Sequence, residues 1–64
     1  MKIYLKQIRI QKNMTLLQLS LASDVSETHI NDIENAKKIP TIKVMCSLAK
    51  ALQVPITDLF SCDD

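Results

Sequence analysis

The sequence predicts an all-α fold of five short helices, on three observations. Apolar residues recur at three- and four-residue spacing along most of the 64 residues. Residues that commonly begin helices, Thr15, Ser26 and Thr41, stand directly before these patterns. No linker or repeat divides the chain, and this length suits one core. We therefore expect a single domain over residues 1–64.

The first two helices are expected within the first third of the chain. The first covers residues 2–12, because Leu5 and Ile8 have the spacing of one helical face. The second covers residues 15–22, which are mostly strong helix formers. The three residues after it, Ser-Asp-Val, have the composition of a tight turn.

The third helix follows that turn, over residues 26–34. Ile30 and Ile33 are three residues apart and therefore share one face, which we expect to be buried. The remaining side chains can form hydrogen bonds and point elsewhere: Glu27, Thr28, His29, Asn31 and Asp32. A short helix with one thin apolar face suits insertion into a DNA major groove.

Two more helices are expected after a loop at residues 35–40. The fourth covers residues 41–52. Its apolar residues repeat at helical spacing: Met45, Leu48, Ala49 and Leu52. Pro55 suits the first turn of a short fifth helix that ends near Phe60. Residues 61–64 are expected to fray.

An ordered set of short motifs runs through nearly the whole chain, from residue 5 to residue 60. In sequence order it consists of Ile8-Arg9, Met14-Thr15, Leu19-Ser20, Val25-Ser26, Ile30, Ile33-Glu34, the run Asn35 to Pro40, Leu48-Ala49, Leu52, Val54 and Leu59-Phe60. No single motif is specific, but the set at these spacings resembles the Cro/cI-type (Xre) helix-turn-helix family of phage and bacterial repressors. The resemblance implies a lambda-repressor-like fold, with the helix-turn-helix at about residues 15–34. It also implies a transcriptional regulator, most simply a repressor, that binds a palindromic double-stranded DNA operator as a homodimer.

The resemblance also suggests which side chains read bases. Glu27, Thr28 and Asp32 match base-reading positions of the family, and His29 lies beside them. Glu can accept from cytosine N4, Thr can touch a thymine methyl, and His can donate to guanine. Other roles remain open, since Glu27 also suits the positive end of a helix dipole and Asp32 suits a solvated surface. The face departs from the family in having no Arg, Lys or Gln.

Basic and acidic residues alternate along the chain in blocks. Residues 1–12 and 35–50 each carry four positive charges, residues 13–34 carry four negative charges, and residues 51–64 carry three. By the resemblance, the loop after the third helix lies against the DNA backbone. The candidate backbone contacts are Thr15, Ser26, Asn35, Lys37, Lys38 and Lys43. The alternative is that the lysines are simply solvated.

Arg9 and Glu34 match a family ion pair that ties the first helix to the end of the third. An Arg side chain can hold a carboxylate through two hydrogen bonds. We therefore interpret both residues as structural, and Arg9 also as a candidate phosphate contact.

The family usually places glycine at positions 24 and 36, where this glycine-free chain has Asp24 and Ala36. Such positions often need a positive φ, which Asp tolerates better than Ala. Either Ala36 carries about 1 kcal/mol of strain, or the third helix ends in another way.

Apolar side chains outside the expected core raise the question of partners. By resemblance, a homodimer contact is expected at Ile56, Leu59 and Phe60, unless Phe60 only closes the core. Three leucines of the second helix occupy positions that are often polar in the family: Leu16, Leu17 and Leu21. They are expected to be half-buried against neighbouring helices, or else to bind a protein partner. A second functional class therefore stays open, a protein-interaction module such as an antirepressor or an antitoxin-like partner.

Composition weighs against other functions. The chain has one Tyr, one Phe and no Trp, too few aromatic residues for a surface that stacks single-stranded bases. It has one His and no Gly-rich phosphate loop, so we expect no enzymatic activity, no cofactor and no metal site. No run is long enough to span a membrane, and two cysteines are too few for a disulfide scaffold. We expect a bacterial or phage-encoded protein acting in the cytoplasm.

Overall fold

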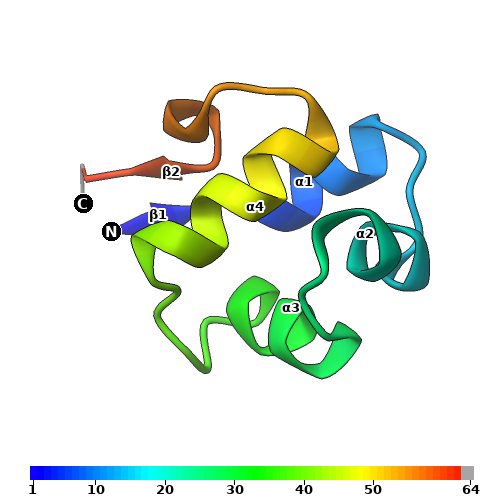
Figure 1. Ribbon diagram of the computed structural model, residues 1–64. Helices are drawn as coiled ribbons and strands as arrows, with labels where there is room; N and C mark the ends of the chain where they lie inside the picture. The colour runs from blue at the N-terminus through cyan, green and yellow to red at the C-terminus, as the bar shows by residue number, and fades with distance from the viewer. Residues whose placement is uncertain (63–64) are drawn as a thin grey trace.

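The computed structural model describes residues 1–62 and is mainly helical (Figure 1). Its α-helices are α1 (Leu5–Gln11), α2 (Leu16–Ser23), α3 (Glu27–Glu34) and α4 (Ile42–Leu52). A short 3₁₀ turn, η1, covers Ile56–Asp58. The strands β1 (Lys2–Ile3) and β2 (Phe60–Ser61) pair in an antiparallel sheet. The described part of the chain therefore has four α-helices rather than the five that the sequence predicted.

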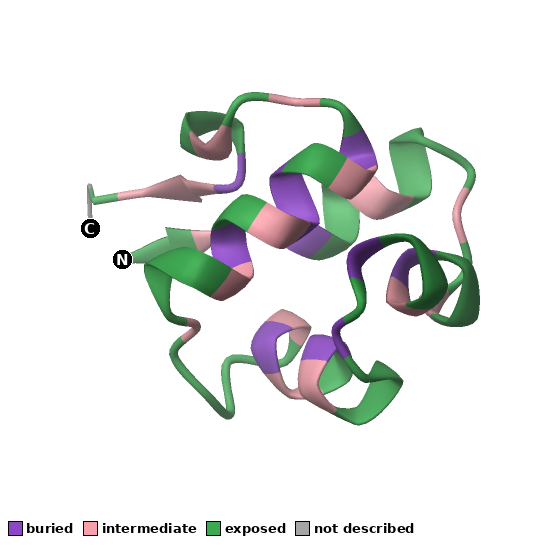
Figure 2. Ribbon diagram, viewed as in Figure 1, coloured by how far each residue is buried: buried purple, intermediate pink, exposed green. Residues whose placement is uncertain are grey.

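The helix α4 crosses the middle of the molecule, with α2 and α3 on one side and η1 and β2 on the other (Figure 1). Its periodic apolar residues all turn inward, as the sequence predicted. The core is aliphatic, and its fully buried side chains are Leu5, Leu19, Ile30, Ile33, Leu48, Leu52 and Leu59. Figure 2 shows the buried stretches of α2, α3 and α4. Burying one such side chain contributes about 1.5–3 kcal/mol relative to leaving it in water. One shared core thus fixes the orientation of α3.

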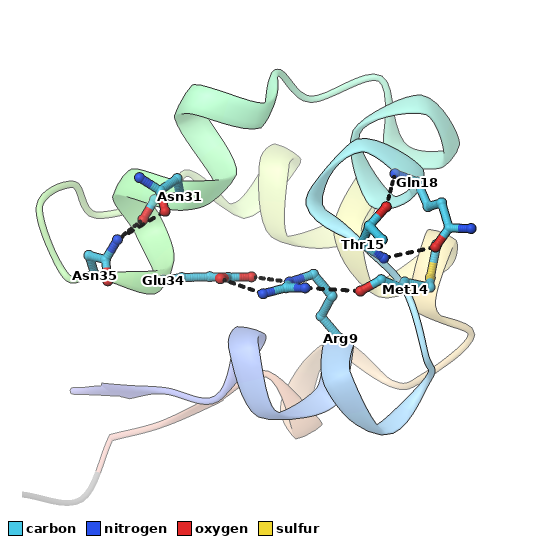
Figure 3. Close-up of polar contacts among 7 residues, drawn as sticks. All are labelled: Arg9, Met14, Thr15, Gln18, Asn31, Glu34 and Asn35. Carbon is cyan, nitrogen blue, oxygen red and sulfur yellow. Dashed lines mark hydrogen bonds and ion pairs between the residues drawn. The ribbon is translucent and has the colours of Figure 1, made fainter.

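Three helices begin as predicted, at residues whose hydroxyl groups accept a backbone hydrogen bond. Thr15 Oγ1 accepts from the Gln18 N–H at 3.0 Å, Ser26 Oγ from the His29 N–H at 3.1 Å, and Thr41 Oγ1 from the Val44 N–H at 3.1 Å. At α2 the Gln18 side chain also accepts from the Thr15 N–H at 2.8 Å, which completes a capping box (Figure 3).

Each of the four α-helices is followed by a residue in the left-handed conformation. The φ angles are 58° at Asn13, 61° at Asp24, 59° at Ala36 and 59° at Gln53. The sequence indicated this geometry for positions 24 and 36, leaving another helix end open at position 36, and did not indicate it for the other two. After α3 the Lys37 N–H donates to the Asp32 carbonyl at 2.8 Å, which makes Ala36 the left-handed residue of a Schellman motif. Because Ala has a Cβ, this conformation costs about 1–2 kcal/mol there.

The turn between α2 and α3 is anchored by a buried polar side chain. Ser23 Oγ donates to the Leu19 carbonyl at 2.7 Å and accepts from the Val25 N–H at 3.3 Å. Val25, in the turn itself, is buried and belongs to the core. The turn therefore holds α3 at a fixed angle to α2.

The two ends of the chain differ from the prediction because they pair with each other. Lys2 lies opposite Ser61 and Ile3 opposite Phe60, so α1 begins only at Leu5. The same pairing takes Phe60 into a strand, and the predicted fifth helix is reduced to the η1 turn. The prediction of fraying was also wrong for Ser61, whereas residues 63–64 lie outside the described part. No local pattern signals a partner at the opposite end of the chain.

Among residues 1–62, no helix is both long and apolar enough to cross a membrane.

Candidate nucleic-acid interface

The outward face of α3 is set by the two isoleucines on its inward face. Ile30 and Ile33 have no exposed surface, so the opposite side of the helix faces solvent. The exposed side chains of α3 and its C-terminal cap are Glu27, Thr28, Asn31 and Asn35. His29 and Asp32 are only partly exposed. The four expected base-reading residues therefore divide into two accessible side chains and two that are partly covered.

Arg9 of α1 and Glu34 of α3 hold the far end of α3 in place (Figure 3). Arg9 Nε donates to Glu34 Oε2 at 2.7 Å and Arg9 Nη2 donates to Glu34 Oε1 at 3.2 Å. The third nitrogen, Nη1, donates to the Met14 carbonyl at 2.9 Å. The hydrogen bond to Glu34 raises the pKa of Arg9, and this outweighs the opposite effect of partial burial. Arg9 thus joins α1, the α1–α2 connection and α3, and all three of its guanidinium nitrogens are used within the protein.

Three of the candidate phosphate contacts are lysines that follow α3. Lys37, Lys38 and Lys43 are all exposed, two in the loop and one in the first turn of α4. Lys38 Nζ lies 3.9 Å from Asp32 Oδ2, and the Asp32 side chain is 21% exposed. One expected phosphate contact is therefore next to one expected base-reading residue, and their charges offset each other.

The other candidate backbone contacts lie at the ends of helices. Thr15 and Ser26 are exposed, and although their oxygens accept in the caps, each hydroxyl hydrogen remains for donation. Asn35 is also exposed, and its Nδ2 donates to the Asn31 carbonyl at 2.9 Å and to Asn31 Oδ1 at 3.1 Å. Thr15 and Ser26, like the lysines, therefore keep a hydrogen-bond donor for a phosphate, whereas the NH₂ group of Asn35 is already engaged with Asn31.

The leucines of α2 divide differently from the expectation. Leu16 is half-buried and packs against the core, as expected. Leu17 and Leu21 are 52% and 77% exposed, so the expectation of half-burial was wrong for both. The reason is helical geometry, because positions two before and two after the buried Leu19 lie on the opposite side of the helix.

Of the three residues expected at the dimer contact, only two have exposed surface. Leu59 is fully buried in the core and cannot reach a second chain. Ile56 and Phe60 are partly exposed and pack against the core edge. Phe60 lines a pocket with the exposed residues Met1 and Ile42, and with Pro40 and Met45.

Two features of this surface were missed in the sequence although a signal was present. Asn31 and Asn35 are four residues apart, the spacing at which helix side chains meet. Thr15 and Gln18 have the spacing of a capping box. By contrast, the Lys38–Asp32 contact depends on the loop turning back at Ala36, which no spacing rule gives.

Comparison with known proteins is consistent with this arrangement. The sequence matches the family described as Helix-turn-helix over residues 5–59. A similar solved structure is the crystal structure of the clp gene regulator ClgR from C. glutamicum, with a TM-score of 0.79 and 30% sequence identity. The match covers 84% of this chain and 70% of that chain. The comparison with curated proteins gave no match.

Proposed function

Because this chain belongs to the Cro/cI-type (Xre) helix-turn-helix family of DNA-binding transcription regulators, we propose that it binds a palindromic operator as a homodimer. In this proposal α3 enters the major groove and repression results from covering promoter DNA. The observation that carries the proposal is the exposed polar face of α3, which the core and the Arg9–Glu34 pair hold rigidly. The protein would act on DNA in a bacterial cytoplasm.

The surroundings of α3 support a contact with the DNA backbone. The exposed lysines Lys37, Lys38 and Lys43 follow α3, and α2 begins with a capped N-terminus. Phosphate contacts of this kind position the protein, whereas side chains on α3 read the bases. Glu27 and Thr28 are the expected base-reading residues best placed for this, since both are exposed in the first turn.

A second copy of the chain would bind through the apolar surface around Phe60. The side chains available there are Ile56 and Phe60, with Met1 and Ile42 beside Phe60. Ile42 is 70% exposed and lines one pocket with Met1 and Phe60, so these apolar side chains form a continuous patch that a second chain could cover. A closed two-fold contact at this surface would set the distance between the two half-sites.

Selection from a randomised duplex DNA pool, followed by salt titration on the enriched sequence, tests the proposal. We expect an inverted repeat with half-sites about one helical turn apart, and a log-log slope against salt of roughly −0.9 for each phosphate contact. Binding that enriches no sequence would contradict operator recognition. Enrichment of a single half-site only would contradict the homodimer.

A protein-interaction module is the second candidate, favoured by two exposed leucines on α2. Leu17 and Leu21 lie on one face of α2, within a segment, residues 13–34, that has four acidic residues and no Lys or Arg. If the DNA selection fails, loss of a co-purifying protein in Leu17→Ser and Leu21→Ser variants would support this function.

A further inference from the structure

The second turn of α3 presents an amide side chain that the base-reading expectations did not include. Asn31 is exposed, while its neighbour Asp32 is partly covered, with 21% of its side chain accessible. Both positions lie away from the buried Ile30 and Ile33, so either could face a DNA groove from this turn. The contacts that Asn31 and Asp32 make within the protein therefore determine which of the two is available to read a base.

The contacts of Asp32 make it the weaker candidate. Its Oδ2 lies 3.9 Å from Lys38 Nζ, which draws the carboxylate toward the loop after α3. A role in holding the loop suits Asp32 better than a role in reading a base.

The contacts of Asn31 fix the direction in which its amide is presented (Figure 3). Asn35 Nδ2 donates to Asn31 Oδ1 at 3.1 Å and to the Asn31 carbonyl at 2.9 Å. The amide oxygen of Asn31 is thus engaged on the side of Asn35, and its NH₂ group remains to donate outward. The second bond, to the main chain, holds Asn35 in place whatever side chain stands at position 31.

We propose that Asn31 is a specificity-determining residue that donates from Nδ2 to purine N7 in the major groove, with Asn35 as its positioning residue. Purine N7 is a hydrogen-bond acceptor on the major-groove edge of both adenine and guanine. A carboxylate at the neighbouring position would instead select the amino groups of cytosine or adenine. The inference rests on the proposed DNA binding by α3 and specifies one base preference within it.

The test is selection from a randomised duplex pool with five versions of the full chain. These are the wild type, Asn31→Ala, Asn31→Asp, Asp32→Ala, and the control Gln7→Ala, which changes an exposed side chain of α1. We expect Asn31→Ala to flatten a purine preference at one position of each half-site by about fivefold or more. The rest of the selected sequence should be kept. Asn31→Asp replaces the donor by an acceptor. It should therefore disfavour guanine at the same position, because guanine presents no amino group in the major groove.

Two results would overturn the inference while leaving operator binding intact. One is an unchanged purine preference in Asn31→Ala, and the other is loss of that preference in Asp32→Ala instead. If the wild type enriches no sequence, both the inference and the proposed function fail. Circular dichroism of each variant checks that α3 is still formed, and an exposed Ala is a better helix former than Asn.

Discussion

Arg9 and Glu34 are the two residues through which α1 holds the end of α3, by two hydrogen bonds of 2.7 and 3.2 Å. Their side chains are only 12% and 3% exposed, so neither charge is well solvated without the other. The pair is largely buried between α1 and α3, whereas Thr28 and Asn31 of α3 are exposed. Its contribution to DNA binding is therefore indirect, through the orientation of the helix.

Replacing one residue of this pair should leave the other charge unpaired, so that the two single losses of stability together exceed the loss in the double variant. We expect Arg9→Ala and Glu34→Ala each to lower the free energy of unfolding by roughly 3 kcal/mol, because each leaves a partly buried charge unpaired. The double variant should lose much less than the sum of the two. Urea denaturation of the four proteins measures the coupling, with Gln7→Ala as a control for an exposed residue. Additive losses would show that the pair contributes nothing specific.

Glycine at the left-handed helix ends should stabilise the chain. Ala36 and Gln53 have φ angles of 59°, which are unfavourable for residues with a Cβ. Ala36→Gly and Gln53→Gly are therefore each expected to raise the free energy of unfolding by about 1 kcal/mol. Ala22→Gly, inside α2, is the matched control and should lower it by about 1 kcal/mol. Thermal denaturation ranks the variants by stability. Equal effects of glycine at positions 22 and 36 would contradict the argument that Ala36 is strained.

Removing a lysine that contacts phosphate should change the salt dependence of DNA binding. For Lys37→Ala, Lys38→Ala and Lys43→Ala we expect the log-log slope to become shallower by about 0.9 each, with the selected sequence unchanged. Lys50→Ala removes an exposed charge from the last turn of α4 and serves as the control. Fluorescence anisotropy from low to high salt measures the slopes. A slope that responds equally to position 50 would indicate a general charge effect.

A charge in the apolar surface around Phe60 should dissociate the proposed dimer. Ile42 is 70% exposed, so Ile42→Asp is expected to leave the core intact and to shift the chain to a monomer, by at least tenfold in the dissociation constant. Leu21→Asp places the same charge on a residue that is 77% exposed on α2 and should leave the dimer unchanged. Sedimentation velocity distinguishes the two variants. If Leu21→Asp dissociates the dimer and Ile42→Asp does not, the dimer interface lies on α2 and not around Phe60.

The sequence predicts those parts of the fold that depend on residues close together in the chain. The caps at Thr15, Ser26 and Thr41 and the inward face of α4 follow from short-range patterns, and all are present. The family's glycines pointed to positive φ at positions 24 and 36, and the structure decides position 36 in favour of a left-handed Ala36. The pairing of β1 with β2 could not be predicted, because it joins opposite ends of the chain.

In the candidate site, too, short-range features could be predicted and features that depend on contacts outside α3 could not. The identity of α3 and its buried isoleucines could be predicted from spacing, and so could the set of side chains that remain outside. Which of them are accessible depends on tertiary contacts. Asp32 is 21% exposed and lies 3.9 Å from Lys38, a contact that needs the loop to turn back at Ala36, whereas the Asn31–Asn35 contact follows from their four-residue spacing.

The pairing of Lys2 with Ser61 also has a kinetic consequence. The helices and their caps form from residues close in sequence, whereas this sheet requires nearly the whole chain to close into a loop. Loop closure costs entropy that increases with length, so the sheet is expected to form after the helices have packed. Contacts that form late in folding act mainly on the rate of unfolding. The two strands therefore slow the opening of the native state and contribute little to the speed at which it is reached.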